Sequence, residues 1–144
     1  FTTGITLSDM LGARALCAGD WDGDGDPDLA IGNSGASALA ILKNDGFGDF
    51  TLTHTIGSQT DVAAMVAGDW DGDGALDLAV ANFGSNSVAV LRNDGFGNFA
   101  SLSAVGGQSG VRALAAADVD GDGALDLAAA DEGSNSVHIM DNLP

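Results

Sequence analysis

The chain has 144 residues, of which 45% are hydrophobic, so it is large enough for one domain with a buried core. Its 21 acidic and 4 basic residues give a net charge of −17, which excludes nucleic acid and an anionic membrane surface as partners, because both need clustered Lys and Arg. No apolar run approaches the length of a membrane span, and we therefore predict no insertion into a membrane.

The sequence repeats itself with a period of 49 residues. Self-comparison divides it into residues 1–49, 50–98 and 99–144, which we interpret as three repeats of a single domain. Each repeat contains four short segments typical of β-strands, separated by clusters of Gly, Asn, Asp and Ser. A period near 50 residues with four strands per repeat is typical of a β-propeller, in which each blade is a four-stranded sheet.

The order of the predicted strands is best seen in the second repeat, where they begin at Phe50, Val62, Asp77 and Ser87. The strand from Phe50 is interpreted as the outermost strand of a blade. The strand from Val62 and its counterparts are rich in alanine, which suits the innermost strands, where blades converge on an axis. Each repeat therefore opens with an outer strand and then supplies three inner ones.

Three blades are too few to close a ring, because propellers typically have four to eight. We therefore predict a six-bladed ring made by a homodimer of three-bladed halves, since two-fold symmetry is the commonest in oligomers. In this arrangement the segment Phe1–Thr6 of one chain completes the blade that ends at Met140 in the other, which removes exposed strand edges. The alternative is that the chain is a fragment of a longer array.

An acidic loop follows the alanine-rich strand of each repeat. It reads D-W-D-G-D-G-D-P-D at Asp20–Asp28, D-W-D-G-D-G-A-L-D at Asp69–Asp77 and D-V-D-G-D-G-A-L-D at Asp118–Asp126. Carboxylates this close repel one another by roughly 1 kcal/mol per pair at 4 Å in water, and a hard cation removes that cost. Oxygen ligands on a flexible loop suit Ca²⁺ better than Mg²⁺, Zn²⁺ or copper. We therefore predict three calcium ions per chain; a metal-free acidic turn is the alternative.

The ligands are expected at loop positions 1, 3, 5, 7 and 9. Position 7 varies in side chain, which fits a ligand supplied by the backbone carbonyl. An EF-hand would also need a bidentate Glu at position 12, where this chain has Ile31, Val80 and Ala129. The predicted ligands are Asp20, Asp22, Asp24, Asp26 and Asp28 in the first loop, Asp69, Asp71, Asp73, Ala75 and Asp77 in the second, and Asp118, Asp120, Asp122, Ala124 and Asp126 in the third.

The second position of the loops is Trp21, Trp70 and Val119. An apolar residue that recurs beside a metal loop is expected to pack between neighbouring blades. A tryptophan that stacks on a sugar is the alternative interpretation.

Two segments carry a resemblance to a known family: G-D-W-D-G-D-G-A-L-D-L-A-V-A-N from Gly68 and S-N-S-V-A-V-L-R-N-D-G-F-G-N-F from Ser85. With their counterparts in the other repeats, they resemble the FG-GAP or VCBS-like repeats of integrin-type β-propellers. The resemblance implies four-stranded blades, Ca²⁺ in the loop between the first and second inner strands, and an extracellular or cell-surface location. Family members often serve adhesion, carbohydrate binding or scaffolding, so a protein or a glycan is the expected ligand.

Nothing in the sequence predicts catalysis. His54 and His138 have no counterparts in the other repeats, and neither forms a recognisable nucleophilic arrangement with the single cysteine, Cys17. We therefore expect a calcium-binding interaction or structural module and not an enzyme. The alternatives are the scaffold domain of a larger extracellular enzyme, or a lectin that binds a glycan opposite the acidic loops through Asn82, Phe83, Asn86, Asp131, Glu132 and Asn135.

Overall fold

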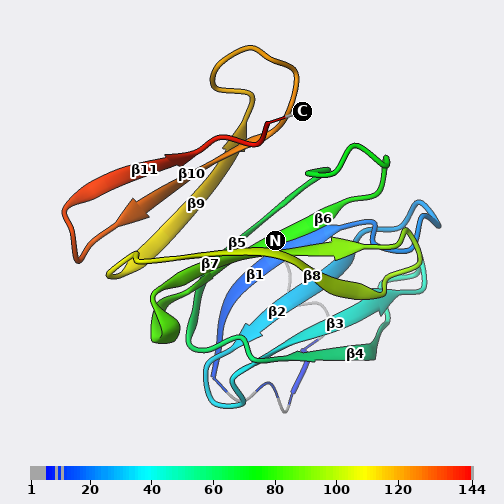
Figure 1. The fold of residues 1–144 in the computed structure, drawn as a ribbon. Helices are drawn as coiled ribbons and strands as arrows, with labels where there is room; N and C mark the ends of the chain where they lie inside the picture. Colours follow the sequence, from blue (N-terminus) through cyan, green and yellow to red (C-terminus); the bar gives the residue numbers. More distant parts are fainter. Residues whose placement is uncertain (1–5, 9, 11, 144) are drawn as a thin grey trace, which may run out of the picture.

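The computed structural model describes residues 6–8, 10 and 12–143, so the predicted outer strand Phe1–Thr6 lies outside the described residues except for Thr6. Within the described part, the chain is all-β, with eleven strands and one short 3-10 turn at Phe83–Ser85 (Figure 1). All strand pairs are antiparallel. No helix in these residues is long and apolar enough to cross a membrane.

The strands form three sheets, each of which follows the chain order without crossovers. The first sheet consists of β1 (Ala13–Gly19), β2 (Asp28–Asn33), β3 (Ala38–Asn44) and β4 (Phe50–Gly57). The second consists of β5 (Val62–Gly68), β6 (Asp77–Asn82), β7 (Ser87–Asn93) and β8 (Phe99–Gly106). The third consists of β9 (Val111–Ala117), β10 (Asp126–Asp131) and β11 (Ser136–Met140).

The first strand of the second and of the third repeat belongs to the sheet of the preceding repeat. β4, which begins at Phe50, pairs with β3, and β8, which begins at Phe99, pairs with β7. This confirms the predicted order, in which a repeat opens with an outer strand. β11 has no outer neighbour among the described residues, so the third sheet ends at an open edge.

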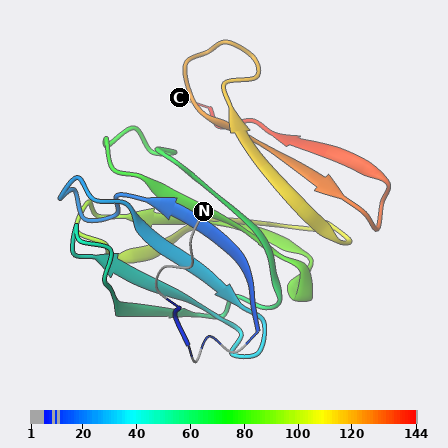
Figure 2. The same ribbon diagram turned by 180° about the vertical axis from the view of Figure 1, so that it is seen from behind.

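The alanine-rich strands lie next to one another where the sheets meet. β5 contacts both β1 and β9, and the two opposite views show the three strands side by side (Figures 1 and 2). The approach is tight between the first two sheets: a Cβ atom on Gly32 of β2 would lie 2.7 Å from Cγ1 of Val62. A small residue is therefore required at this position of β2, and the alanine-rich strands are the innermost ones, as predicted.

Two apolar cores fill the junctions between sheets. The first contains Trp21 and Ile41 of the first repeat together with Val62 and Val80 of the second sheet. The second contains Trp70, Val88 and Val111, among others. The two tryptophans are only 1% and 6% exposed, which confirms that this loop position packs between sheets. Their burial is a main apolar contribution to holding neighbouring sheets together.

The outer face of the third sheet has no such cover. Val119 is 54% exposed although its counterparts are the buried tryptophans, so the packing prediction fails at this position within one chain. The side chains of Val137 and Ile139 on β11 are 66% and 48% exposed, whereas their counterparts Val88 and Val90 belong to the second core. The physical reason is that the described chain provides no fourth sheet to cover them.

The opposite end of the stack, at the first sheet, is partly covered. Ile31, Ala40 and Leu42 form a third apolar cluster, against which Leu7 and Met10 pack. The chain entering β1 therefore lies against this face.

Candidate metal sites

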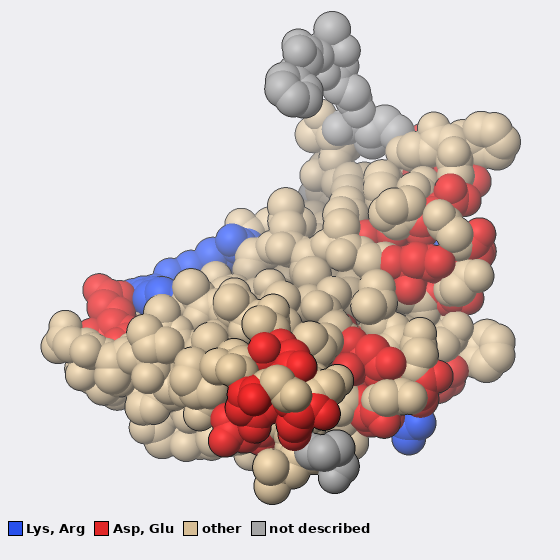
Figure 3. Space-filling model, turned by 90° about the horizontal axis from the view of Figure 1, so that it is seen from above, with Lys and Arg blue, Asp and Glu red and all other residues tan. Residues whose placement is uncertain are grey.

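The three acidic loops join the first and second strands of the three sheets and lie on the same side of the molecule (Figure 1). Figure 3 shows their acidic side chains as separate clusters along this side, with few basic side chains near them. The loops curl tightly because two glycines adopt left-handed backbone angles; in the first loop, φ is 76° at Gly23 and 92° at Gly25.

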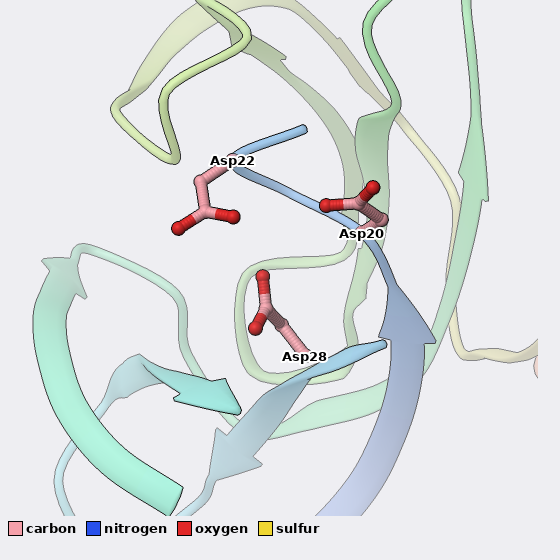
Figure 4. A group of neighbouring side chains, drawn as sticks. All are labelled: Asp20, Asp22 and Asp28. Carbon is pink, nitrogen blue, oxygen red and sulfur yellow. The ribbon is translucent and has the colours of Figure 1, made fainter. Parts of the chain in front are cut away.

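In each loop, three carboxylates converge. Asp20 at the end of β1, Asp22 in the loop and Asp28 at the start of β2 surround a common space (Figure 4). One oxygen from each of these residues lies within 4.8 Å of the others. The equivalent group in the second loop is Asp69, Asp71 and Asp77, whereas the group in the third loop is Asp118, Asp120 and Asp122, with the fifth loop position in place of the ninth.

Backbone amides hold the first carboxylate of each loop in place. The N–H groups of Gly23 and Gly25 donate to Oδ1 and Oδ2 of Asp20, at 2.8 and 2.9 Å. The same pair of bonds recurs at Asp69 and at Asp118. The glycines therefore stabilise the loop in two ways: their backbone angles allow the turn, and their backbone N–H groups bind the first carboxylate.

The last carboxylate of each loop connects three segments of its sheet. Asp28 accepts hydrogen bonds from the N–H of Trp21 at 3.1 Å and from the N–H of Asn44, at the end of β3, at 2.8 Å. Asp77 and Asp126 accept the equivalent bonds. Burial raises the pKa of Asp28 and of Asp77, whereas the backbone donors Asn142 and Val119 lower the pKa of Asp126.

The remaining predicted ligands are not all drawn into the clusters. Asp24 and Asp73 lie outside the groups of converging carboxylates, as does Asp126 in the third loop. Oδ1 of Asp24 accepts the N–H of Asp26 at 3.0 Å, and this bond, followed by Lys43, lowers the pKa of Asp24. The carbonyl ligands predicted at Asp26, Ala75 and Ala124 stay a prediction.

Two basic side chains that sequence reasoning missed reach into the first two loops. Lys43 contacts both Asp22 and Asp24, and Arg92 lies 2.5 Å from Asp71 and 3.0 Å from Asp73. The two bases occupy equivalent positions, one residue before N-D-G-F-G, which was a signal available in the sequence. In the third repeat the equivalent residue is Asp141, so the third loop has no such base.

An asparagine from the next sheet also holds each of the first two loops. Nδ2 of Asn93 donates to the carbonyl of Trp21 at 2.8 Å, and Nδ2 of Asn142 donates to the carbonyl of Trp70 at 2.9 Å. These bonds join residues 72 positions apart. Each loop is thus tied both to its own sheet and to the following one.

The donor set fits a hard divalent cation. Calcium binds oxygen ligands at about 2.3–2.6 Å, so two oxygens bound to one ion lie at most about 5 Å apart. The converging carboxylate oxygens, all within 4.8 Å of one another, meet this limit in all three loops. An ion there would neutralise carboxylates that otherwise repel one another, and in the first two loops it would join the ends of two strands.

The turns opposite the loops, proposed above for a glycan, are largely engaged with one another. The Arg112 guanidinium lies 3.9 Å from the centroid of the Phe83 ring, and its Nε donates to Glu132 at 2.6 Å. Nδ2 of Asn82 donates to Gln59, and Asp131 accepts the N–H of Ser109. These contacts occupy several of the groups that a sugar would need.

Comparison with known proteins identifies one family. The FG-GAP-like repeat matches residues 20–80 and 69–129. Each match begins at the first aspartate of one acidic loop and ends in the second strand of the next sheet, so it contains two acidic loops. No curated protein matches the chain. Since the two matches together cover well over half of the 144 residues, the chain belongs to the family of FG-GAP-like repeat proteins.

Proposed function

We propose that this protein is a calcium-binding β-propeller module that serves structure and interaction, with one Ca²⁺ per blade and no catalytic activity. The observation that carries the proposal is that three carboxylates converge in the loop between the first two strands of every sheet, and that the first carboxylate is held by the same backbone donors each time. The FG-GAP-like repeats support an extracellular setting, as a secreted or cell-surface protein.

The ion acts as a clamp in this proposal. In the first two loops the groups that hold it come from the end of one inner strand and the start of the next. The last carboxylate of every loop also accepts a hydrogen bond from the end of the third strand or from the residues that follow it. Binding lowers the free energy of the folded state alone, because the converging geometry is lost on unfolding. At a free calcium concentration of 100 times Kd, each site contributes about 2.7 kcal/mol.

Thermal unfolding with and without a calcium chelator tests this function. We expect chelation to lower the melting temperature by roughly 10 °C or more, given three sites and the size of the domain. Magnesium at the same concentration is expected to restore little of the loss, because Mg²⁺ retains its waters and demands stricter geometry. A melting temperature that does not respond to the chelator contradicts calcium binding.

We further propose that two chains close a six-bladed ring. The support comes from the open edge of β11 and the exposed outer face of the third sheet. Asn44 pairs with Phe50 and Asn93 with Phe99, so the repeat spacing puts Phe1 opposite Asn142 if the N-terminal segment of a second chain adds to β11. Sedimentation in calcium tests this: a species of two chains is expected, and a monomer of 14.2 kDa rules it out.

The lectin alternative has less support. The residues proposed for glycan binding contact one another, and the two tryptophans beside the loops are buried between sheets. A glycan array probed with and without calcium separates the two functions. Binding to a defined sugar class would replace the structural module with a lectin.

A further inference from the structure

We propose that the third acidic loop is completed by a second copy of this chain, whose Asn44 donates its side-chain amide to the backbone carbonyl of Val119. The inference rests on the proposed ring and adds to it the contact that joins the two copies. It makes the third metal loop a site shared between chains, whereas the first two loops are completed within one chain.

A hydrogen bond from an asparagine side chain to a backbone carbonyl recurs between neighbouring sheets. The amides of Asn93 and Asn142 donate to the carbonyls of Trp21 and Trp70, respectively. Asn44, Asn93 and Asn142 are equivalent in the three repeats, as are Trp21, Trp70 and Val119. The series lacks one member, the bond from Asn44 to Val119, which a single chain cannot form because the two residues belong to its first and last sheets.

The side-chain amide of Asn44 has an N–H donor that is not used within the described residues. The amide of Asn93 makes two bonds, to the carbonyl of Trp21 and, at 3.1 Å, to the carbonyl of Leu76. Within the described residues, the amide of Asn44 makes only the second kind, to Pro27 at 3.1 Å. A primary amide has two N–H donors, so one donor of Asn44 remains available for the missing contact.

The two ends of the stack of three sheets expose complementary apolar side chains. Val119, Val137 and Ile139 are exposed on the third sheet, while Leu16 is 65% exposed on the first. The counterparts of Leu16 are Met65 and Leu114, which pack into the first and second cores. Each exposed set therefore represents one half of a junction that is closed elsewhere in the same chain, and the occupant that fits both halves is another copy.

The position of Leu7 also supports a contact with a second copy. Its counterpart is Ile56 on β4, which packs into the core between the first two sheets. Leu7 packs against the cluster of Ile31, Ala40 and Leu42 on the free face of the first sheet. It therefore occupies the place that an outer strand of a preceding sheet would give it, as expected if the residues before it join the third sheet of another copy.

Calcium binding at the third loop and association of the chains are then linked. Val119 lies between Asp118 and Asp120 of the third group of carboxylates, and it would accept a hydrogen bond from the second copy through its carbonyl, so one residue joins the loop to the interface. By thermodynamic reciprocity, calcium strengthens the dimer to the same degree that dimerisation strengthens calcium binding at this loop.

Cross-linking of single-cysteine chains tests the contact. In a Cys17→Ser background, Asn44→Cys is placed in one chain and Val119→Cys in another, and a short thiol cross-linker is added in calcium. We expect covalent dimers in the mixture and few in either chain alone, because a two-fold dimer juxtaposes residue 44 of one copy with residue 119 of the other. Dimers that sediment as two chains but yield no mixed cross-link overturn this contact and leave the ring standing. A monomer at all concentrations overturns both.

A matched pair of substitutions measures the strength of the contact. Asn44→Ala is expected to weaken the dimer about 25-fold, because two junctions each lose a hydrogen bond worth about fivefold. Asn93→Ala removes the equivalent bond inside the chain and should lower the melting temperature while the dimer dissociation constant stays within about twofold. Equal effects of both substitutions on the dimer would contradict the assignment of Asn44 to the interface.

Discussion

The last aspartate of the first two acidic loops stabilises the fold and also belongs to the candidate metal site. Asp77 is fully buried and accepts hydrogen bonds from the backbone N–H groups of Trp70 and Asn93. A buried donor that loses its acceptor costs about 1–3 kcal/mol. This carboxylate therefore stabilises the loop before any ion binds.

Replacement of Asp77 tests this structural role. Asp77→Ala is expected to lower the free energy of unfolding by about 2–4 kcal/mol in calcium-free buffer, because two buried donors lose their acceptor. Urea unfolding in the presence of a chelator measures the change. Asp49→Ala, which removes an exposed carboxylate between β3 and β4, is the control and should change stability little. A calcium-free stability unaffected by Asp77→Ala would restrict this residue to metal binding.

The bases in the first two loops pair with carboxylates that a metal ion would also bind, so they would compete with it. Arg92 is half-exposed and pairs with Asp71 and Asp73, and this pairing contributes, after the backbone N–H of Ala75, to lowering the pKa of Asp73. An ion entering the loop therefore has to share or displace these contacts. The third loop, with Asp141 in the equivalent position, imposes no such competition.

Arg92→Ala is therefore expected to raise the calcium affinity of the second loop, roughly two- to tenfold at low ionic strength, because a positive charge is removed from beside the ion. Isothermal titration calorimetry resolves the change, and added salt should reduce it. Arg112→Ala removes a base that pairs with Glu132 in the turns opposite the loops, and it should leave calcium binding as it was. A weaker second site in Arg92→Ala would mean that the arginine shapes the loop more than it competes.

At the level of strands and loops, the regular features were predictable because they are local. Short segments typical of β-strands between turn signals indicated the strands, and the order of the segments indicated that a repeat opens with an outer strand. The spacing of Asp20 and Asp22 indicated two of the converging carboxylates. The contact of Asn93 with Trp21 could not be predicted in the same way, because it depends on how closely one sheet packs on the next.

The distance between sheets also depends on single small residues. A side chain at Gly32 would meet Val62 of the next sheet at 2.7 Å, well inside van der Waals contact. Gly32→Ala is therefore expected to destabilise the protein by about 1–3 kcal/mol, since an overpacked core forces backbone shifts. Gly57→Ala is the control, because nothing lies within 4 Å of the added methyl group at this strand end. Equal unfolding free energies for the two variants would show that the sheets separate without cost.

At the scale of the whole molecule, the three sheets have similar sequences but differ in how much of their apolar surface is covered by a neighbouring sheet. The same loop position is 1% exposed at Trp21, 6% at Trp70 and 54% at Val119. A sequence repeated so regularly gives every sheet the same two interaction faces, and a stack of three necessarily leaves one face of each kind at its ends. The described chain therefore leaves the apolar face of the third sheet exposed, and the proposed association of two chains would bury it.

Val137→Asp tests whether this face is buried in solution. Val137 is 66% exposed in the single chain, so the substitution should change the stability of an isolated chain by no more than about 0.5 kcal/mol. If a second copy covers the face, an unpaired carboxylate is buried in the interface and the dimer dissociates at concentrations where the unmodified protein remains associated. Sedimentation equilibrium measures this, with Ala104→Asp on β8 of the second sheet as a control for added charge. A Val137→Asp protein that associates as tightly as the unmodified chain would mean that the third sheet remains open to solvent.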